Sequence, residues 1–187
     1  MGKYLFTKVH RAVVKRGYMK PKEFFLTIWW KMEMAGDIIR KNNPNLRGKI
    51  ITSTKDILDD NSTPTLRDKV RRLLEIRGVG VSLASAILAV CFPERYAELD
   101  PRAWRTLYRW SSEGSLNSKW GVIRTEDIPT RREEAIDAYL RYNRTCSRLA
   151  HHIFRDLPLE KRVRTLVGAL SAYGLEMELR SFLRKVK

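Results

Sequence analysis

Residues 81–92 constrain the fold more than any other part of the chain, because they are apolar almost throughout. A helix of this length with apolar residues on nearly every side has to be buried on most sides, so other elements must surround it. Gly78-Val79-Gly80 comes directly before this segment, and the residues up to Ile76 follow helical apolar spacing. We therefore expect two helices joined by a tight turn, with the second helix in the interior.

The rest of the chain also has the spacing of amphipathic helices, and no segment shows the sustained alternation of a strand. The expected fold class is all-α, as one unit over residues 1–187 or as two helical lobes. Helices are expected up to Gly17, from Pro21 to Asn42, from Pro64 (with Thr63 as its cap) to about Ile76, over residues 81–92, from Pro101 to about Trp110, over residues 132–154, and after Pro158 with a break at Gly174. Loops are expected over residues 44–63, with one short turn near 56–58, and over residues 111–130.

Charge limits the kinds of partner that the chain can have. Lysine and arginine number 37 against 21 aspartates and glutamates, which gives a net charge of +16. Such an excess repels itself in a compact fold, so it favours a polyanionic partner, and nucleic acid fits better than an anionic membrane surface or a general effect on solubility. No apolar stretch reaches the roughly 18 residues needed to span a bilayer, and the first residues do not resemble a signal peptide. The expected location is intracellular, in the cytoplasm or nucleoid.

The cysteine and histidine patterns predict no metal site. Cys91 and Cys146 each lie inside an expected apolar helix and have no CxxC partner, so we expect two buried free thiols in a reducing compartment. His151 and His152 are adjacent, and neighbouring positions on a helix point about 100° apart, which does not suit a shared metal ion.

The Gly78-Val79-Gly80 turn is the strongest candidate for a binding site. Glycines at both ends permit positive φ angles and let another molecule approach the backbone closely, while Val79 is expected to point inward. The helix that follows directs its unpaired N-terminal N–H groups toward the turn, which favours a phosphate oxygen. Contacts of this kind read the backbone of DNA, so binding would be independent of sequence and sensitive to salt. The alternative is an ordinary turn between two helices.

The region from residue 73 to residue 105 resembles the helix-hairpin-helix DNA glycosylase superfamily, the relatives of endonuclease III. The matching residues are Leu73-x-x-Ile76-x-Gly78-Val79-Gly80, then Ala84, Ala86, Ile87 and Leu88, and Asp100-x-x-x-Trp104-Arg105. A second resemblance, carried by Trp30-Lys31 and Leu99-Asp100-x-Arg102-Ala103, is to a branch of helix-hairpin-helix proteins with no assigned chemistry. The resemblance implies a glycosylase-like helical fold, a helix-hairpin-helix at about residues 64–92, duplex DNA as the partner and a role in base-excision repair.

The resemblance also assigns roles to two positions. Asp100 matches the family's aspartate, whose carboxylate would stabilise positive charge at C1′ as a base leaves and would orient water. Ser82 stands where bifunctional members carry a lysine nucleophile, and a serine cannot form the Schiff base that strand cleavage needs. The expected activity is that of a monofunctional glycosylase without lyase activity. The alternatives are a non-catalytic DNA-binding or structural relative, in which Asp100 is only a helix cap, and a helical protein–protein adaptor.

The remaining candidate residues are basic and aromatic. The expected DNA contacts are Gly78, Val79, Gly80 and Ser82 at the hairpin, with Arg77, Lys69, Arg72, Arg102 and Arg105 around it. The expected inner stripe of the helix from Pro21 is Phe25, Ile28, Trp29, Met32 and Ile39, whereas Trp30 and Trp104 are the candidates for a base pocket. Arg141, Arg144 and Arg148 form a basic row at helical spacing, or a solvated helix face. No cofactor and no iron–sulfur cluster is expected, since the family's four-cysteine cluster is absent, and a monovalent cation at the hairpin is the one ion left open.

Overall fold

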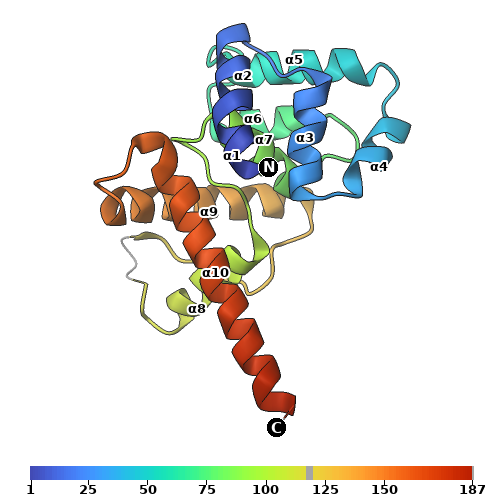
Figure 1. Cartoon of the computed structure of the whole chain (residues 1–187). Coiled ribbons are helices and arrows are strands. Elements are labelled where there is room, and N and C mark those ends of the chain that lie inside the picture. The colour runs from blue at the N-terminus through green and yellow to red at the C-terminus, as the bar shows by residue number, and fades with distance from the viewer. Residues whose placement is uncertain (117–119, 187) are drawn as a thin grey trace. The chain divides into compact units, whose positions relative to one another are not determined.

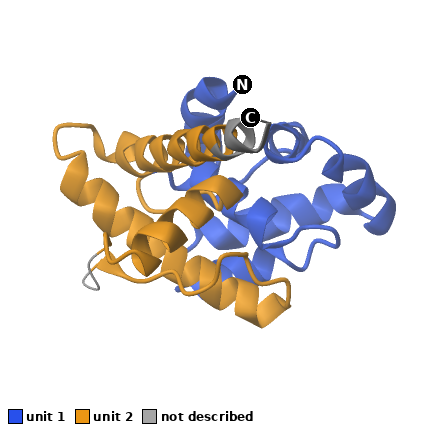
Figure 2. Ribbon diagram, turned by 90° about the horizontal axis from the view of Figure 1, so that it is seen from below, with its two compact units in different colours: residues 1–93 blue, residues 94–187 orange. Residues whose placement is uncertain are grey.

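The computed structural model describes residues 1–116 and 120–186, with side chains up to residue 180. Helices make up 69% of the chain, and the described residues contain no strand, which confirms the all-α prediction (Figure 1). The chain divides into two compact units, residues 1–93 and 94–187 (Figure 2). No helix in the described part of the chain is both long enough and apolar enough to cross a membrane.

Unit 1 is built around the apolar helix that the sequence predicts. Every residue of α7 except Ser82 is buried, as expected for a helix that is apolar on nearly every side. The helices α2, α3 and α6 and the π-helix η1 pack against it. The elements of unit 1 are α1 (Gly2–Tyr4), η1 (Leu5–Val9), α2 (His10–Arg16), α3 (Pro21–Lys31), α4 (Ala35–Asn42), α5 (Leu46–Leu58), α6 (Leu66–Leu73) and α7 (Val81–Cys91).

The single helix predicted from Pro21 to Asn42 is wrong, because the structure has two helices there, α3 and α4. The chain leaves the helical conformation at Met32, whose φ and ψ angles are −158° and 93°. The break turns Ala35 and Ile39 toward the core, while Met32 itself stays 50% exposed. The expected apolar stripe through Phe25, Ile28, Trp29 and Met32 is therefore replaced in α3 by a buried stripe of Phe24, Thr27 and Ile28.

Two further predictions for unit 1 need correction. Residues 46–58, expected to be mostly loop, form the helix α5, with Ile50, Ser53 and Ile57 buried along one side. The cap of α6 is Thr65 and not Thr63: the hydroxyl of Thr65 accepts a hydrogen bond from the amide of Asp68 at 3.1 Å. Thr63 lies buried in the loop between α5 and α6, and its hydroxyl donates to the carbonyl of Asp56 at 2.8 Å.

Unit 2 contains α8 (Pro101–Ser112), α9 (Arg132–Ile153) and α10 (Leu159–Val186). Both α8 and α9 begin where the sequence predicts. The described residues between them contain no α-helix, in line with the predicted loop, whose residues 117–119 lie outside the described part of the chain. The predicted break at Gly174 is wrong, since α10 continues through it. A Cβ at Gly174 would lie 3.0 Å from the hydroxyl of Thr106 and 3.1 Å from the carbonyl of Arg102, so the glycine lets α10 approach α8 closely.

Both cysteines are buried and free, as expected, Cys91 in unit 1 and Cys146 in unit 2. Burial raises the pKa of each thiol to about 12, because the interior does not solvate a thiolate.

Candidate nucleic-acid interface

The turn between α6 and α7, residues 74–80, is called the hairpin below. It closes through hydrogen bonds from the amide of Ile76 to the carbonyl of Leu73 at 3.2 Å and from the amide of Val79 to the carbonyl of Ile76 at 2.9 Å. Ile76 and Val79 are buried, which confirms the inward orientation expected for Val79. The glycines on either side of Val79 are exposed, so the apolar side chain fixes the turn while its backbone faces solvent.

The two glycines of the hairpin differ in conformation. Gly78 has a φ of +91°, and a Cβ there would lie 3.1 Å from Cγ1 of Ile39 in α4. Gly78 is thus required by both its backbone angle and its packing against α4. Gly80 has a φ of −90° and a ψ of 176°, which any residue adopts, and a Cβ there would meet no atom within 4 Å. The fold itself does not need a glycine at Gly80.

Gly80 is also the N-cap residue of α7, and it has no side chain to cap the helix. The first amide that bonds within the helix is that of Ala84, which donates to the carbonyl of Gly80 at 2.9 Å. The amides that precede it in the first turn have no carbonyl one turn earlier in the helix, as at any helix start. Ser82 lies in this first turn, half-buried, and its carbonyl accepts a hydrogen bond from the hydroxyl of Ser85 at 2.6 Å. The start of α7 therefore presents backbone donors beside an open approach at Gly80.

Asn43 holds the hairpin in place, a role that the sequence did not reveal. Its amide nitrogen donates to the carbonyls of Ile39, at 2.7 Å, and of Arg77, at 2.8 Å. Its amide oxygen accepts from the backbone N–H of Arg77 at 3.0 Å and from the ammonium of Lys49 at 3.4 Å. One buried side chain thus joins the end of α4 to the hairpin. In the sequence, Asn43 only marks the end of a helix, because its partner Arg77 comes 34 residues later.

Arg77 is the basic residue of the hairpin itself. Its side chain is exposed, and the described residues give its guanidinium no carboxylate partner. The backbone of Arg77 is held by Asn43, so the side chain extends from a fixed point. A cation in this setting keeps its full charge available to an anion in solution.

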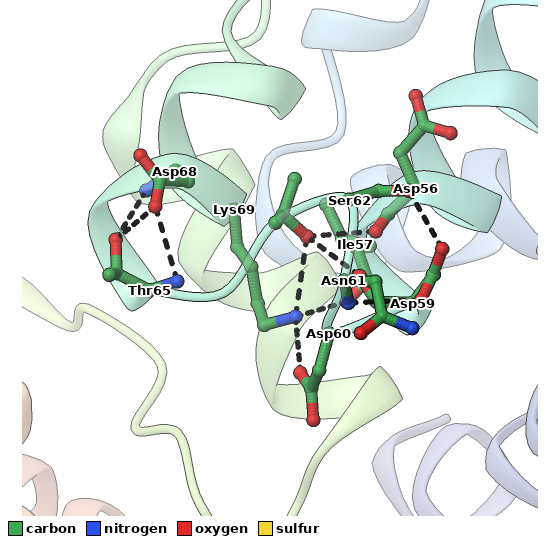
Figure 3. Close-up of polar contacts among 10 residues, drawn as sticks. Asp56, Ile57, Asp59, Asp60, Asn61, Ser62, Thr65, Asp68 and Lys69 are labelled. Carbon is green, nitrogen blue, oxygen red and sulfur yellow. Dashed lines mark hydrogen bonds and ion pairs between the residues drawn. The ribbon is translucent and has the colours of Figure 1, made fainter.

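Lys69, expected to contact phosphate, lies inside unit 1 with 0% of its surface exposed. Its ammonium donates to the carbonyl of Ile57 at 2.6 Å and to the hydroxyl of Thr63 at 3.3 Å, and it pairs with Asp60 at 2.8 Å (Figure 3). It also lies 5.2 Å from the ring centre of Phe92. The side chain is fully occupied in joining α6 to the loop after α5, so the structure removes Lys69 from the proposed phosphate contacts.

Arg72 also forms ion pairs with carboxylates of unit 1. Its guanidinium pairs with Asp56 at 2.6 Å and forms a second, very short ion pair with Glu75. It lines a polar cavity of about 410 Å³ with Glu75 and residues at the start of α5. Its positive charge is balanced locally, which weakens its attraction for a phosphate.

The other predicted basic contacts and Asp100 belong to unit 2. Arg102 and Arg105 both pair with Glu178 of α10, at 3.4 Å and 2.8 Å. Together with Asp100 and Pro101, these three side chains line a pocket of about 250 Å³. Two arginines share one glutamate there, next to one aspartate, so the pocket carries no excess of positive charge.

Asp100 caps α8. One carboxylate oxygen accepts hydrogen bonds from the amides of Arg102, at 2.9 Å, and Ala103, at 3.0 Å, and from the hydroxyl of Ser171 at 2.8 Å. The first two bonds satisfy donors at the helix start, as in any N-cap, and the third joins α8 to α10. The capping role is therefore present, and the same carboxylate lines the pocket of about 250 Å³.

The tryptophans do not lie as the sequence suggested. Trp104 is 2% exposed, its ring lies 5.9 Å from that of Tyr142, and its indole N–H donates to the carbonyl of Thr125 at 2.9 Å. Trp30 packs edge-on against Phe6 with ring centres 5.4 Å apart. Both candidates for a base pocket are therefore used in packing.

Trp29, expected on the inner side of α3, is instead 50% exposed, so that prediction is wrong. It lines a groove of about 410 Å³ with Phe25 and Arg40. The buried stripe of α3 is displaced by one residue from the predicted one, and this displacement exposes Trp29 and brings Trp30 against Phe6.

Comparison with known protein families, curated proteins and solved structures finds no match to this chain.

Proposed function

We propose that the chain binds duplex DNA through the hairpin of unit 1, by contacts with the phosphate backbone and without sequence preference. The observation that carries the proposal is the open approach to Gly80. A glycine occupies a position where the fold would accept any residue, and the space beside it lies at the donor end of α7. A phosphate oxygen can approach that backbone only where no side chain intervenes.

Three other observations support the proposal. Val79 and Asn43 hold the turn from the inside, so its donors are fixed before a ligand arrives. Arg77 extends from the same turn with its charge unbalanced by any described carboxylate. The net charge of +16 attracts a polyanion over long range. Because all these features would contact phosphate groups and not the edges of bases, the affinity for DNA should depend little on its sequence.

The replacement Gly80→Ala tests the hairpin directly. The new methyl group has space in the free protein, so the free energy of unfolding should change by less than about 1 kcal/mol. In the complex it would stand where the phosphate approaches, and the dissociation constant for a random-sequence duplex should rise by about tenfold or more, equivalent to about 1.4 kcal/mol. Fluorescence anisotropy with a labelled duplex measures both variants.

Gly168→Ala is the matched control. Gly168 lies in α10 of unit 2, is exposed, and has no atom within 4 Å of a Cβ placed on it. Both replacements add one methyl group in open space, but only one lies at the hairpin. Equal DNA affinity of Gly80→Ala and Gly168→Ala would contradict the proposal.

A second candidate function is the release of a damaged base by hydrolysis at Asp100, in the manner of a monofunctional glycosylase. The observation that favours it is the pocket of about 250 Å³, in which the Asp100 carboxylate is fixed by three hydrogen bonds. An ionised carboxylate held there would stabilise positive charge on a sugar and orient a water molecule. Ser82 supplies no amine for strand cleavage, so the product would be an abasic site.

The replacement Asp100→Asn separates this chemistry from capping. Asparagine caps helices about as well as aspartate, so α8 should remain intact while the negative charge is lost. Duplexes that carry a panel of damaged bases, treated with hot alkali after incubation, would reveal abasic sites. The candidate function requires release by the wild type and by Ser171→Ala, which keeps the carboxylate, and none by Asp100→Asn. Release that is absent from the wild type, or equal in Asp100→Asn, would rule it out.

A further inference from the structure

The arginines of the chain differ in whether a carboxylate balances them. A salt bridge at the surface offsets the charge of an arginine locally, so the paired residues attract a polyanion less than the unpaired ones do. Among the ion pairs of the described residues are those of Arg16 with Glu23, Arg40 with Asp37, Arg72 with Asp56 and Glu75, Arg102 and Arg105 with Glu178, Arg131 with Glu134, and Arg180 with Glu176.

The second part of α9 carries a local excess of positive charge in the sequence. Between residues 138 and 155 the sequence contains four arginines and no aspartate or glutamate. Three of these arginines, Arg141, Arg144 and Arg148, are exposed and follow one another at the i, i+3, i+7 positions of a single helix face. The described residues give Arg141 and Arg144 no carboxylate partner. We call these three residues the arginine row.

The helix that carries the arginine row is firmly held on its other side. Tyr139 donates its hydroxyl hydrogen to the carbonyl of Ala97 at 3.0 Å, and the amide oxygen of Asn143 accepts from the N–H of Ala97 at 2.7 Å. Tyr142 donates to the carbonyl of Glu98 at 3.1 Å. These contacts fix the rotation of α9, so the row keeps one direction toward solvent.

The dimensions of the row suit a phosphate backbone. A helix rises 1.5 Å per residue, so the seven-residue separation of Arg141 and Arg148 covers roughly 10 Å, which is about three base-pair steps of B-DNA at 3.4 Å each. Arginine forks bind phosphate through two hydrogen bonds. A membrane fits less well, because a helix at a bilayer surface inserts its apolar side, and the apolar side of α9 is buried in unit 2.

We propose that the arginine row of α9 is a second phosphate-binding surface, which contacts the backbone of a DNA duplex that the chain binds. The inference takes its partner, duplex DNA, from the proposed function, but it stands on different residues in a different unit. The row adds affinity and salt sensitivity without adding sequence preference, because its side chains meet phosphates.

The test compares two double variants of the full chain that lose the same net charge. Arg141→Gln/Arg144→Gln removes two arginines of the row, while Arg131→Gln/Arg180→Gln removes two exposed arginines that are paired with Glu134 and Glu176. Dissociation constants for a random-sequence duplex are measured from 50 to 200 mM salt, with thermal unfolding as a check on folding. The negative slope of log K against log[salt] should become shallower by about 0.9 for each lost phosphate contact, so by about two in the row variant. It should stay near the wild-type value in the control.

Each other outcome overturns the inference. A wild-type slope in the row variant would mean that the row does not touch phosphate. An equally weakened salt dependence in both variants would mean that only the total charge of the chain matters. Binding of phosphatidylserine vesicles that depends on the row, with unchanged DNA binding, would make it a lipid surface. A failure of the proposed role of the hairpin can be told apart from a failure of the arginine row. In that case Gly80→Ala would bind DNA like the wild type, while Arg141→Gln/Arg144→Gln would still show a weaker salt dependence.

Discussion

The ammonium of Lys69 is enclosed by a carbonyl, a hydroxyl and a carboxylate, and these contacts give the residue a structural role in joining α6 to the loop after α5 (Figure 3). A sequence pattern cannot separate such a lysine from one that faces solvent, because both stand next to apolar residues on a helix. Its partners come from the end of α5 and from the loop after it, a stretch for which the sequence predicts mostly loop. Arg102 and Arg105 show the same limit, since their partner Glu178 is more than 70 residues away.

The replacement Lys69→Met should lower the free energy of unfolding by about 1–3 kcal/mol. Methionine keeps the volume of the side chain but leaves the carbonyl of Ile57 without its donor inside the protein. Urea denaturation measures the loss. The control Lys55→Met lies exposed on α5 and should change stability by less than about 0.5 kcal/mol. Equal stabilities of the two variants would contradict the structural role of Lys69.

Alkaline pH should destabilise the protein through its buried acids. Burial raises the pKa of Cys91 and Cys146 to about 12, and it raises the pKa of Tyr139 and Tyr142 well above the usual value of tyrosine. In the unfolded chain the thiols lose their protons near pH 9, while the folded chain keeps them. The folded state then holds more protons, so the free energy of unfolding should fall above about pH 9 by up to about 1.4 kcal/mol per pH unit for each thiol.

Chemical denaturation between pH 7 and pH 11 measures this dependence. Below pH 8 these groups are protonated in both states and should contribute no slope. The variant Cys146→Ala should lose part of the alkaline slope, whatever its stability at neutral pH. An unchanged slope in that variant would contradict the assignment to the buried thiols.

Among the elements, the hairpin and α7 could be predicted from the sequence because their signals are local. An almost wholly apolar segment must be an interior helix, and two glycines around a valine mark the turn before it. Helix α5 could not be predicted in the same way. Its Gly48 and its β-branched residues, such as Ile50, Ile51 and Thr52, have low helix propensity, and packing of Ile50 and Ile57 against the rest of unit 1 outweighs it.

The break between α3 and α4 has no sequence signal either, since neither proline nor glycine stands at residues 32–34. The exposure of Trp29 and the packing of Trp30 follow from the displaced stripe of α3, whereas Trp104, the other candidate for a base pocket, is buried in unit 2. In the candidate site, the turn and the inward Val79 follow from the sequence, whereas the brace from Asn43 and the pairing of the basic residues depend on tertiary contacts.

The hairpin should tolerate a methyl group at one glycine and not at the other. Gly78→Ala places a Cβ at a φ of +91° and 3.1 Å from Cγ1 of Ile39, so it should lower the free energy of unfolding by about 1–3 kcal/mol. Gly80→Ala has neither conflict and should remain within about 1 kcal/mol of the wild type. Urea denaturation of both variants gives the comparison. A larger loss for Gly80→Ala than for Gly78→Ala would contradict the geometry of the turn.

For the whole molecule, part of the net charge of +16 can be assigned to particular exposed cations that form no ion pair with a described carboxylate. The exposed cations without a described carboxylate partner that carry the two proposals are Arg77 of the hairpin in unit 1 and Arg141 and Arg144 of the arginine row in unit 2. A polyanion bound at either place would neutralise charge that the fold leaves unbalanced. Each unit thus offers phosphate a surface of its own.

The most direct test of DNA binding through phosphate contacts is the affinity of the wild-type chain for two duplexes of unrelated sequence, measured from 50 to 200 mM salt. Binding through phosphate contacts predicts the same affinity for both duplexes and a linear fall of log K with log[salt], with a slope of about −0.9 for each phosphate contacted. An affinity that does not change with salt, or a strong preference for one of the two sequences, would contradict it.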